Sequence, residues 1–142
     1  MRRPPQPTPT RTPRITYRRS FPATYRSVPE ARDWARSLLG PSPTLDDTLL
    51  LLSEVVTNAI THSDSGHNRS GAVTVQITRA ASTIQVEVSD AGSSTTTPTV
   101  RTPTLSDDRG RGLWLVNMLS DHWGFQHDES GVLVWFNLTQ HD

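Results

Sequence analysis

Residues 45–63 read LDDTLLLLSEVVTNAITHS and carry the clearest periodicity in the chain. Apolar residues recur in it at intervals of three and four, which is the spacing of one face of an α-helix. The apolar stripe consists of Leu45, Leu49, Leu52, Val56 and Ile60, and it is widened by Leu51, Val55 and Ala59. The pattern predicts a long amphipathic helix that packs its apolar side on a core.

The same helix carries three polar residues at intervals of four, Glu54, Asn58 and His62. Each step of four turns the side-chain direction by about 40°, so the three form a slanted stripe at the border of the core face. Asn58 offers a neutral oxygen of the kind that Mg²⁺ accepts, and Glu54 is placed to orient or deprotonate a hydroxyl or a water. His62 either contacts phosphate or caps the helix. The competing interpretation is an ordinary solvated helix face.

The remaining segments alternate between strand and helix patterns. Residues 15–25 resemble an edge strand interrupted by Pro22, and a helix begins near Pro29 and ends at Gly40. Further strands are predicted at 72–79, 83–89, 122–127 and 131–138, and another helix from 110. Two hairpins with helices between them predict an α+β fold, a two-layer sandwich whose mixed, mostly antiparallel sheet has its helices on one face.

A second polar motif, Asp90-Ala91-Gly92, directly follows the strand predicted at 83–89. A carboxylate at a strand end can accept a hydrogen bond from the amino group of adenine, which guanine does not offer at that position. Gly92 would let the backbone pass close to the base. An ordinary strand-to-loop turn explains the same residues, because Asp and Gly are common in turns.

A third motif, Gly110-Arg111-Gly112-Leu113, opens the last predicted helix. Free N–H groups and the positive end of the helix dipole favour phosphate at a helix start, and Arg109 and Arg111 add positive charge. A flexible hinge before a helix is the alternative. Together, in this order, the three motifs predict one site for adenine, magnesium and a triphosphate.

Length and composition indicate a single domain with a terminal extension. The chain has 142 residues, no cysteine and a formal net charge of zero, and all its cations are arginines. We expect an Arg- and Pro-rich disordered arm at 1–14, a folded domain at 15–142 and a lid at about 91–109. Absence of cysteine fits a reducing cytoplasm, and no apolar run is long enough to suggest a membrane segment.

The three motifs resemble those of the GHKL, or Bergerat-fold, ATP-binding proteins. Residues 54–62 are similar to the family's N box, residues 90–92 to its first glycine box and residues 110–116 to its second. The resemblance spans about 20–138. The small size, Asp46-Asp47 before the N box, and Trp123-Gly124 resemble the anti-sigma-factor serine-kinase branch of actinobacteria.

The resemblance implies a role for each motif. Asn58 would be the magnesium ligand, Glu54 the catalytic base and Asp90 the adenine reader, while Gly110 and Gly112 would cradle the phosphates beneath a closing lid. It further implies ATP and Mg²⁺ as cofactors, and a serine kinase that phosphorylates an anti-anti-sigma (STAS-like) partner. Such a protein also holds a sigma factor and forms a homodimer.

Two alternatives from other functional classes stay open. The first is a non-catalytic switch, in which ATP gates the binding of a protein partner without phosphoryl transfer. The second and weaker one is nucleic-acid contact through the basic arm. Residues 1–20 include no acidic residue and contain Arg2, Arg3, Arg11, Arg14, Arg18 and Arg19.

Overall fold

The computed structural model describes residues 14–62, 71–90, 111–128 and 131–139. Its elements, in chain order, are β1 (Ile15–Pro22), α1 (Ser27–Leu39), α2 (Leu45–His62), β2 (Ala72–Arg79), β3 (Thr83–Asp90), α3 (Arg111–Leu119), β4 (His122–Asp128) and β5 (Gly131–Thr139). The lid predicted at 91–109 and the arm predicted at 1–14, except Arg14, lie outside the described residues.

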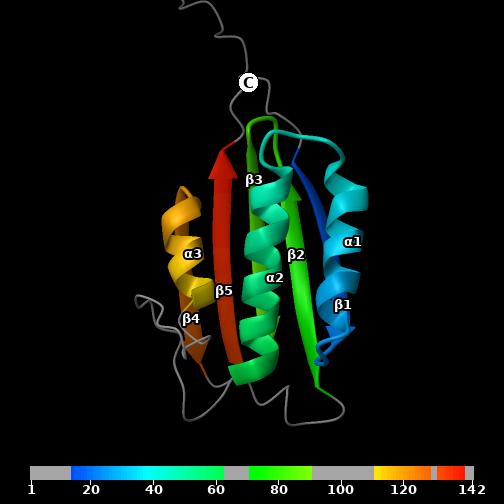
Figure 1. Ribbon diagram of the computed structural model, residues 1–142, viewed down its shortest axis with the longest axis vertical. Helices are drawn as coiled ribbons and strands as arrows, with labels where there is room; N and C mark the ends of the chain where they lie inside the picture. Colours follow the sequence, from blue (N-terminus) through cyan, green and yellow to red (C-terminus); the bar gives the residue numbers. More distant parts are fainter. Residues whose placement is uncertain (1–13, 63–70, 91–110, 129–130, 140–142) are drawn as a thin grey trace, which may run out of the picture.

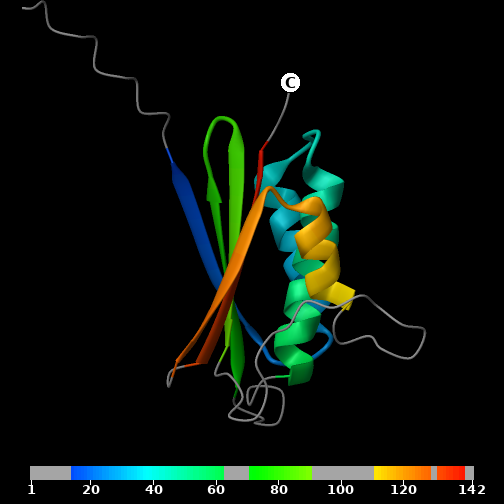
Figure 2. The same ribbon diagram turned by 90° about the vertical axis from the view of Figure 1, so that its left-hand side faces the viewer.

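The five strands form one sheet in the order β1-β2-β3-β5-β4 (Figure 1). Every described neighbouring pair is antiparallel. Figure 2 shows the sheet on edge, with α1, α2 and α3 all on one of its faces. The α+β two-layer prediction is therefore confirmed, and the sheet is antiparallel in all of its described pairings rather than mixed.

The first strand and the first helix begin or end a few residues from their predicted positions. β1 ends at Pro22, because proline cannot donate to a further strand pairing. α1 begins two residues before Pro29, and a proline is tolerated there because the first turn of a helix leaves its N–H groups unpaired anyway. Gly40 ends the helix with a φ of 62°, a conformation that suits glycine.

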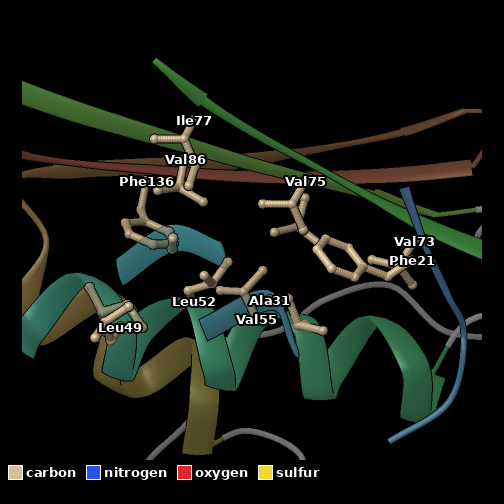
Figure 3. Close-up of a cluster of buried hydrophobic side chains, with 14 of the residues drawn as sticks. Phe21, Ala31, Leu49, Leu52, Val55, Val73, Val75, Ile77, Val86 and Phe136 are labelled. Carbon is tan, nitrogen blue, oxygen red and sulfur yellow. The ribbon is translucent and has the colours of Figure 1, made fainter. Parts of the chain in front are cut away.

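The core lies between the helices and the inner face of the sheet. Alternate residues of β2 and β3 point into it, and Figure 3 shows them packed against α2. The fully enclosed strand side chains include Phe21, Val73, Val75, Ile77, Ile84, Val86 and Phe136. The register pairs them across strands, for instance Val86 with Phe136. A face of this kind is what the alternating sequence pattern predicts.

α2 is buried across the widened apolar stripe that the sequence predicts. Leu51 and Val55, which flank the stripe, are 0% and 1% exposed. The reason is tertiary, since α1 and α3 pack against opposite sides of α2 while the sheet covers its base. α2 is thus the central element of the helical layer, and its side chains are fixed on three sides.

The other face of the sheet is polar along β1, β2 and β3. Hydroxyl pairs link neighbouring strands there, with Ser20 and Thr74 2.8 Å apart. Glu87 accepts hydrogen bonds from the side-chain amides of Gln76 and Gln85. A polar outer face is typical of an antiparallel sheet that is covered on one side. Within the described part of the chain, no helix has the length and apolarity that crossing a membrane requires.

Candidate functional site

The described parts of the three predicted motifs lie toward one end of the molecule. α2 and β3 both run toward this end, and α3 begins beside the half of α2 that is nearer to it and runs away from it (Figures 1 and 2). α2 also packs directly against β3 and α3. Segments far apart in sequence therefore place the last turn of α2, the end of β3 and the first turn of α3 near one another.

Glu54 and Asn58 lie one turn apart on α2, and both side chains are half-buried. Their neighbours Val55 and Val56 are each 1% exposed and point into the core. The two polar residues consequently occupy the border between the packed side of the helix and its accessible side. A border position lets a side chain reach a ligand while the packed helix fixes its direction.

The side-chain amide of Asn58 provides the most informative detail of the site. Its Nδ2 atom is buried and has no hydrogen-bond partner among the described residues. Leaving a buried polar atom unpaired costs free energy, so such an atom needs an explanation. Nitrogen and oxygen of an amide are assigned from their hydrogen bonds, so a ligand can select which of the two faces it. Asn58 therefore fits a partner such as a hydrated metal ion bound to phosphate.

The donor set also suits magnesium rather than a metal held entirely by protein. Among the described residues, no three His, Cys, Asp or Glu side chains gather closely enough to hold a metal ion. Mg²⁺ bound to a nucleotide keeps several waters and uses phosphate oxygens, so one or two protein oxygens suffice. The Asn58 amide matches that limited requirement.

Asp90 is the last residue of β3, whereas the sequence predicted it to be the first residue after the strand. Its position in the sheet is set by pairing with Val132 of β5. Asp90 is half-buried and, by the alternation along β3, shares the inner face of the strand with Ile84, Val86 and Val88. Gly92 lies outside the described residues.

The start of α3 differs electrostatically from the starts of the other two helices. The first turns of α1 and α2 contain Glu30 and Asp46-Asp47, whereas the first turn of α3 contains no acidic residue. Its N–H groups and helix dipole are therefore not neutralised from within the turn. This favours an external anion such as phosphate.

Several predicted site residues are described only in part or not at all. Arg111, Gly112 and Leu113 form the first turn of α3, and His62 is the last residue of α2, so the backbone of each is placed. Arg109 and Gly110 lie outside the described residues. The roles of these six candidates, with Gly92, stay predictions.

One contact at this end could not be anticipated from the sequence. The hydroxyl of Tyr25, in the connection between β1 and α1, lies 2.9 Å from the hydroxyl of Thr61 in α2. No periodicity or motif links two positions so far apart in the chain. The contact follows only from the packing of α1 beside α2.

The comparisons with known proteins agree with this geometry. A family model described as "Histidine kinase-like ATPase domain" matches residues 21–138. The matched span runs from the end of β1 to the end of β5 and contains every candidate site residue. The search of curated proteins finds no match.

Proposed function

The chain belongs to the histidine kinase-like ATPase domain family, and from this membership we propose that it is an ATP-dependent regulatory kinase. Membership supports an ATP-binding regulatory protein of GHKL type. The proposal goes further: the protein transfers the γ-phosphoryl group of ATP to a serine of an anti-anti-sigma (STAS-like) partner, and it also binds a sigma factor. It would act in the cytoplasm as a homodimer.

The observation that carries the proposal is the buried Nδ2 atom of Asn58, which has no hydrogen-bond partner among the described residues and lies on the part of α2 that approaches β3 and α3. In a nucleotide site Asn58 would present its oxygen to magnesium, and Asp90 would accept a hydrogen bond from the adenine amino group. The first turn of α3 would donate N–H groups to phosphate. A bound magnesium ion would offset the negative charge of the phosphate oxygens.

Glu54 is the residue that suggests catalysis rather than binding alone. It lies one turn before Asn58 on the same border of α2. Its carboxylate would accept the proton of the serine hydroxyl as the serine oxygen attacks the γ-phosphorus. The bond between that phosphorus and the β–γ bridging oxygen breaks, and ADP leaves with the bonding electrons. ATP binding by itself would need no such base.

Phosphoryl transfer to a purified STAS-like domain from γ-labelled ATP tests the proposal. We expect Glu54→Gln to reduce the rate by about 10²–10⁴-fold, the usual contribution of a general base, while ATP affinity measured by calorimetry is retained. Glu30→Gln, which makes the same change in the first turn of α1, should transfer at the wild-type rate.

The two readouts separate the alternatives. Wild-type protein that binds ATP but transfers phosphate to no STAS-like domain would contradict the kinase and leave the ATP-gated switch. Failure to bind ATP at all would contradict both. Equal rates for Glu54→Gln and wild type would remove Glu54 from the mechanism.

A further inference from the structure

The Tyr25 side chain makes a polar contact that burial does not explain. Tyr25 is 60% exposed, so its ring contributes little to the core. Its hydroxyl nevertheless lies 2.9 Å from Thr61 Oγ1, 36 positions further along the chain. Thr61 is itself exposed on the last turn of α2. The contact joins the β1–α1 connection to the end of the helix that carries Asn58.

The connection that holds Tyr25 is firmly anchored. Ala23 and Ser27, on either side of Tyr25, are 8% and 1% exposed. The Ser27 hydroxyl donates to the carbonyl of Pro22, and the N–H of Val28 donates to the carbonyl of Tyr25 at 3.1 Å. Tyr25 therefore projects from a hydrogen-bonded turn whose neighbours are fixed in the core.

The same connection also holds the residue that precedes β2. The N–H of Ala23 donates to the carbonyl of Gly71 at 3.1 Å. Thr61 and Gly71 stand on opposite sides of the segment that joins α2 to β2. The β1–α1 connection thus binds both flanks of that segment, one through the Tyr25 side chain and one through its own backbone.

The last turn of α2 is the part of the helix that most needs such support. The final carbonyls of a helix have no partner within it, and end turns open more readily than the middle. Thr61 and His62 lie in this turn, and Asn58 directly precedes it, one turn before His62. Opening of the turn would displace Asn58 from the position in which it faces a ligand.

We propose that Tyr25 is a positioning residue for the nucleotide site. Its hydroxyl holds the last turn of α2 against the β1–α1 connection and so keeps Asn58 in place. The inference rests on the proposed function for the identity of the ligand, but not for the effect on α2. Tyr25 itself touches no substrate in this role.

Hydrogen exchange and nucleotide affinity, measured together, test the inference. In Tyr25→Phe and Thr61→Val we expect the amides of the last turn to exchange about two- to tenfold faster, which matches the loss of one exposed hydrogen bond. ATP affinity should fall about two- to fivefold because the binding-competent state is less populated. The thermal midpoint should stay near that of wild type.

Two controls isolate the effect. Thr61→Ser keeps the hydroxyl, so this variant should show the same amide exchange and the same ATP affinity as the wild type. Ser20→Ala removes a comparable hydroxyl pair, with Thr74 at 2.8 Å on the outer face of the sheet, and should change neither. The double variant Tyr25→Phe/Thr61→Val should add little to either single change, since both remove the same contact.

The outcomes separate this inference from the proposed function. Unchanged exchange in Tyr25→Phe and Thr61→Val would overturn it, whatever the affinities. Faster exchange with unchanged ATP affinity would overturn the positioning role while leaving the contact as a local support. If wild-type protein bound no ATP, the proposed function would fail in the titration alone, and the positioning role would fall with it.

Discussion

At the scale of single residues, the protein buries polar side-chain atoms without a hydrogen-bond partner among the described residues. Two buried side-chain atoms, Asn58 Nδ2 and Ser42 Oγ, have no hydrogen-bond partner among the described residues. Ser42 lies between α1 and α2, away from the end toward which the described parts of the motifs lie. Asn58 lies toward that end. The same defect therefore has a functional explanation at one position and none that the structure shows at the other.

This pair gives a matched prediction. Asn58→Ala and Ser42→Ala each remove an unpaired buried group, so the free energy of unfolding should be unchanged or rise by up to about 1 kcal/mol. Only Asn58→Ala should abolish ATP binding in the presence of magnesium. Urea unfolding and calorimetry measure the two effects. Retained ATP binding in Asn58→Ala, or a large loss of stability, would show that Asn58 is a structural residue.

At the scale of the element, α2 combines the core and the site in one helix. Its 18 residues present apolar side chains to the sheet and to both neighbouring helices. Glu54 and Asn58 emerge at the border of this buried surface. Packing on three sides fixes the rotation of the helix about its axis, and that rotation determines where the two polar side chains point. A substitution that disturbs the packing of α2 should therefore change the directions of Glu54 and Asn58 as well as destabilise the core.

Two leucines of α2 that lie two positions apart test how strongly the helix depends on its packing. Leu52 is 0% exposed and Leu50 is 40% exposed. Leu52→Ala should lower the free energy of unfolding by about 2–5 kcal/mol, because it leaves a cavity in the core. Leu50→Ala should cost less than about 1 kcal/mol. Chemical denaturation measures both, and equal losses would contradict the assigned orientation of α2.

At the scale of the whole molecule, the topology brings together the elements that carry the candidate site residues. An antiparallel hairpin brings β3 back to the end where α2 finishes, and α3 begins beside the half of α2 that is nearer to that end before leading into β4 (Figure 1). The charges are also unevenly distributed. Six of the 14 arginines lie in the first 20 residues, while all 14 acidic residues lie beyond them. Because the chain beyond residue 20 has a net negative charge, a cation that accompanies a bound triphosphate would reduce the electrostatic repulsion.

A nucleotide that binds only the folded protein should stabilise all of it. At an ATP concentration 100 times the dissociation constant, the gain is about 2.7 kcal/mol, which for a domain of this size raises the thermal midpoint by roughly 5–15 °C. Differential scanning fluorimetry with ATP and magnesium measures the shift. Adding EDTA should remove most of it. An equal shift with EDTA would exclude a metal from the binding mode.

The secondary structure and the fold class could be predicted because they depend on local periodicity. Alternation in 72–79 and 83–89 predicted two strands that form the hairpin β2–β3, and the strands differ from the prediction by at most one residue. The start of α1 was predicted too late, because proline is tolerated at several positions of the first turn and therefore does not mark the first residue of a helix. The order of the three motifs, and their resemblance to the family's motifs, could likewise be recognised in the sequence.

The sequence by itself determined which residues are apolar, where helices and strands form, and which polar side chains lie at the border of the α2 core face. The packing of the elements alone reveals that α1 and α3 both lie against α2, that Asn58 Nδ2 lacks a partner among the described residues, and that Tyr25 reaches Thr61. The physical reason is that periodicity reports contacts within one element. Burial and hydrogen bonding between distant segments depend on how whole elements pack together.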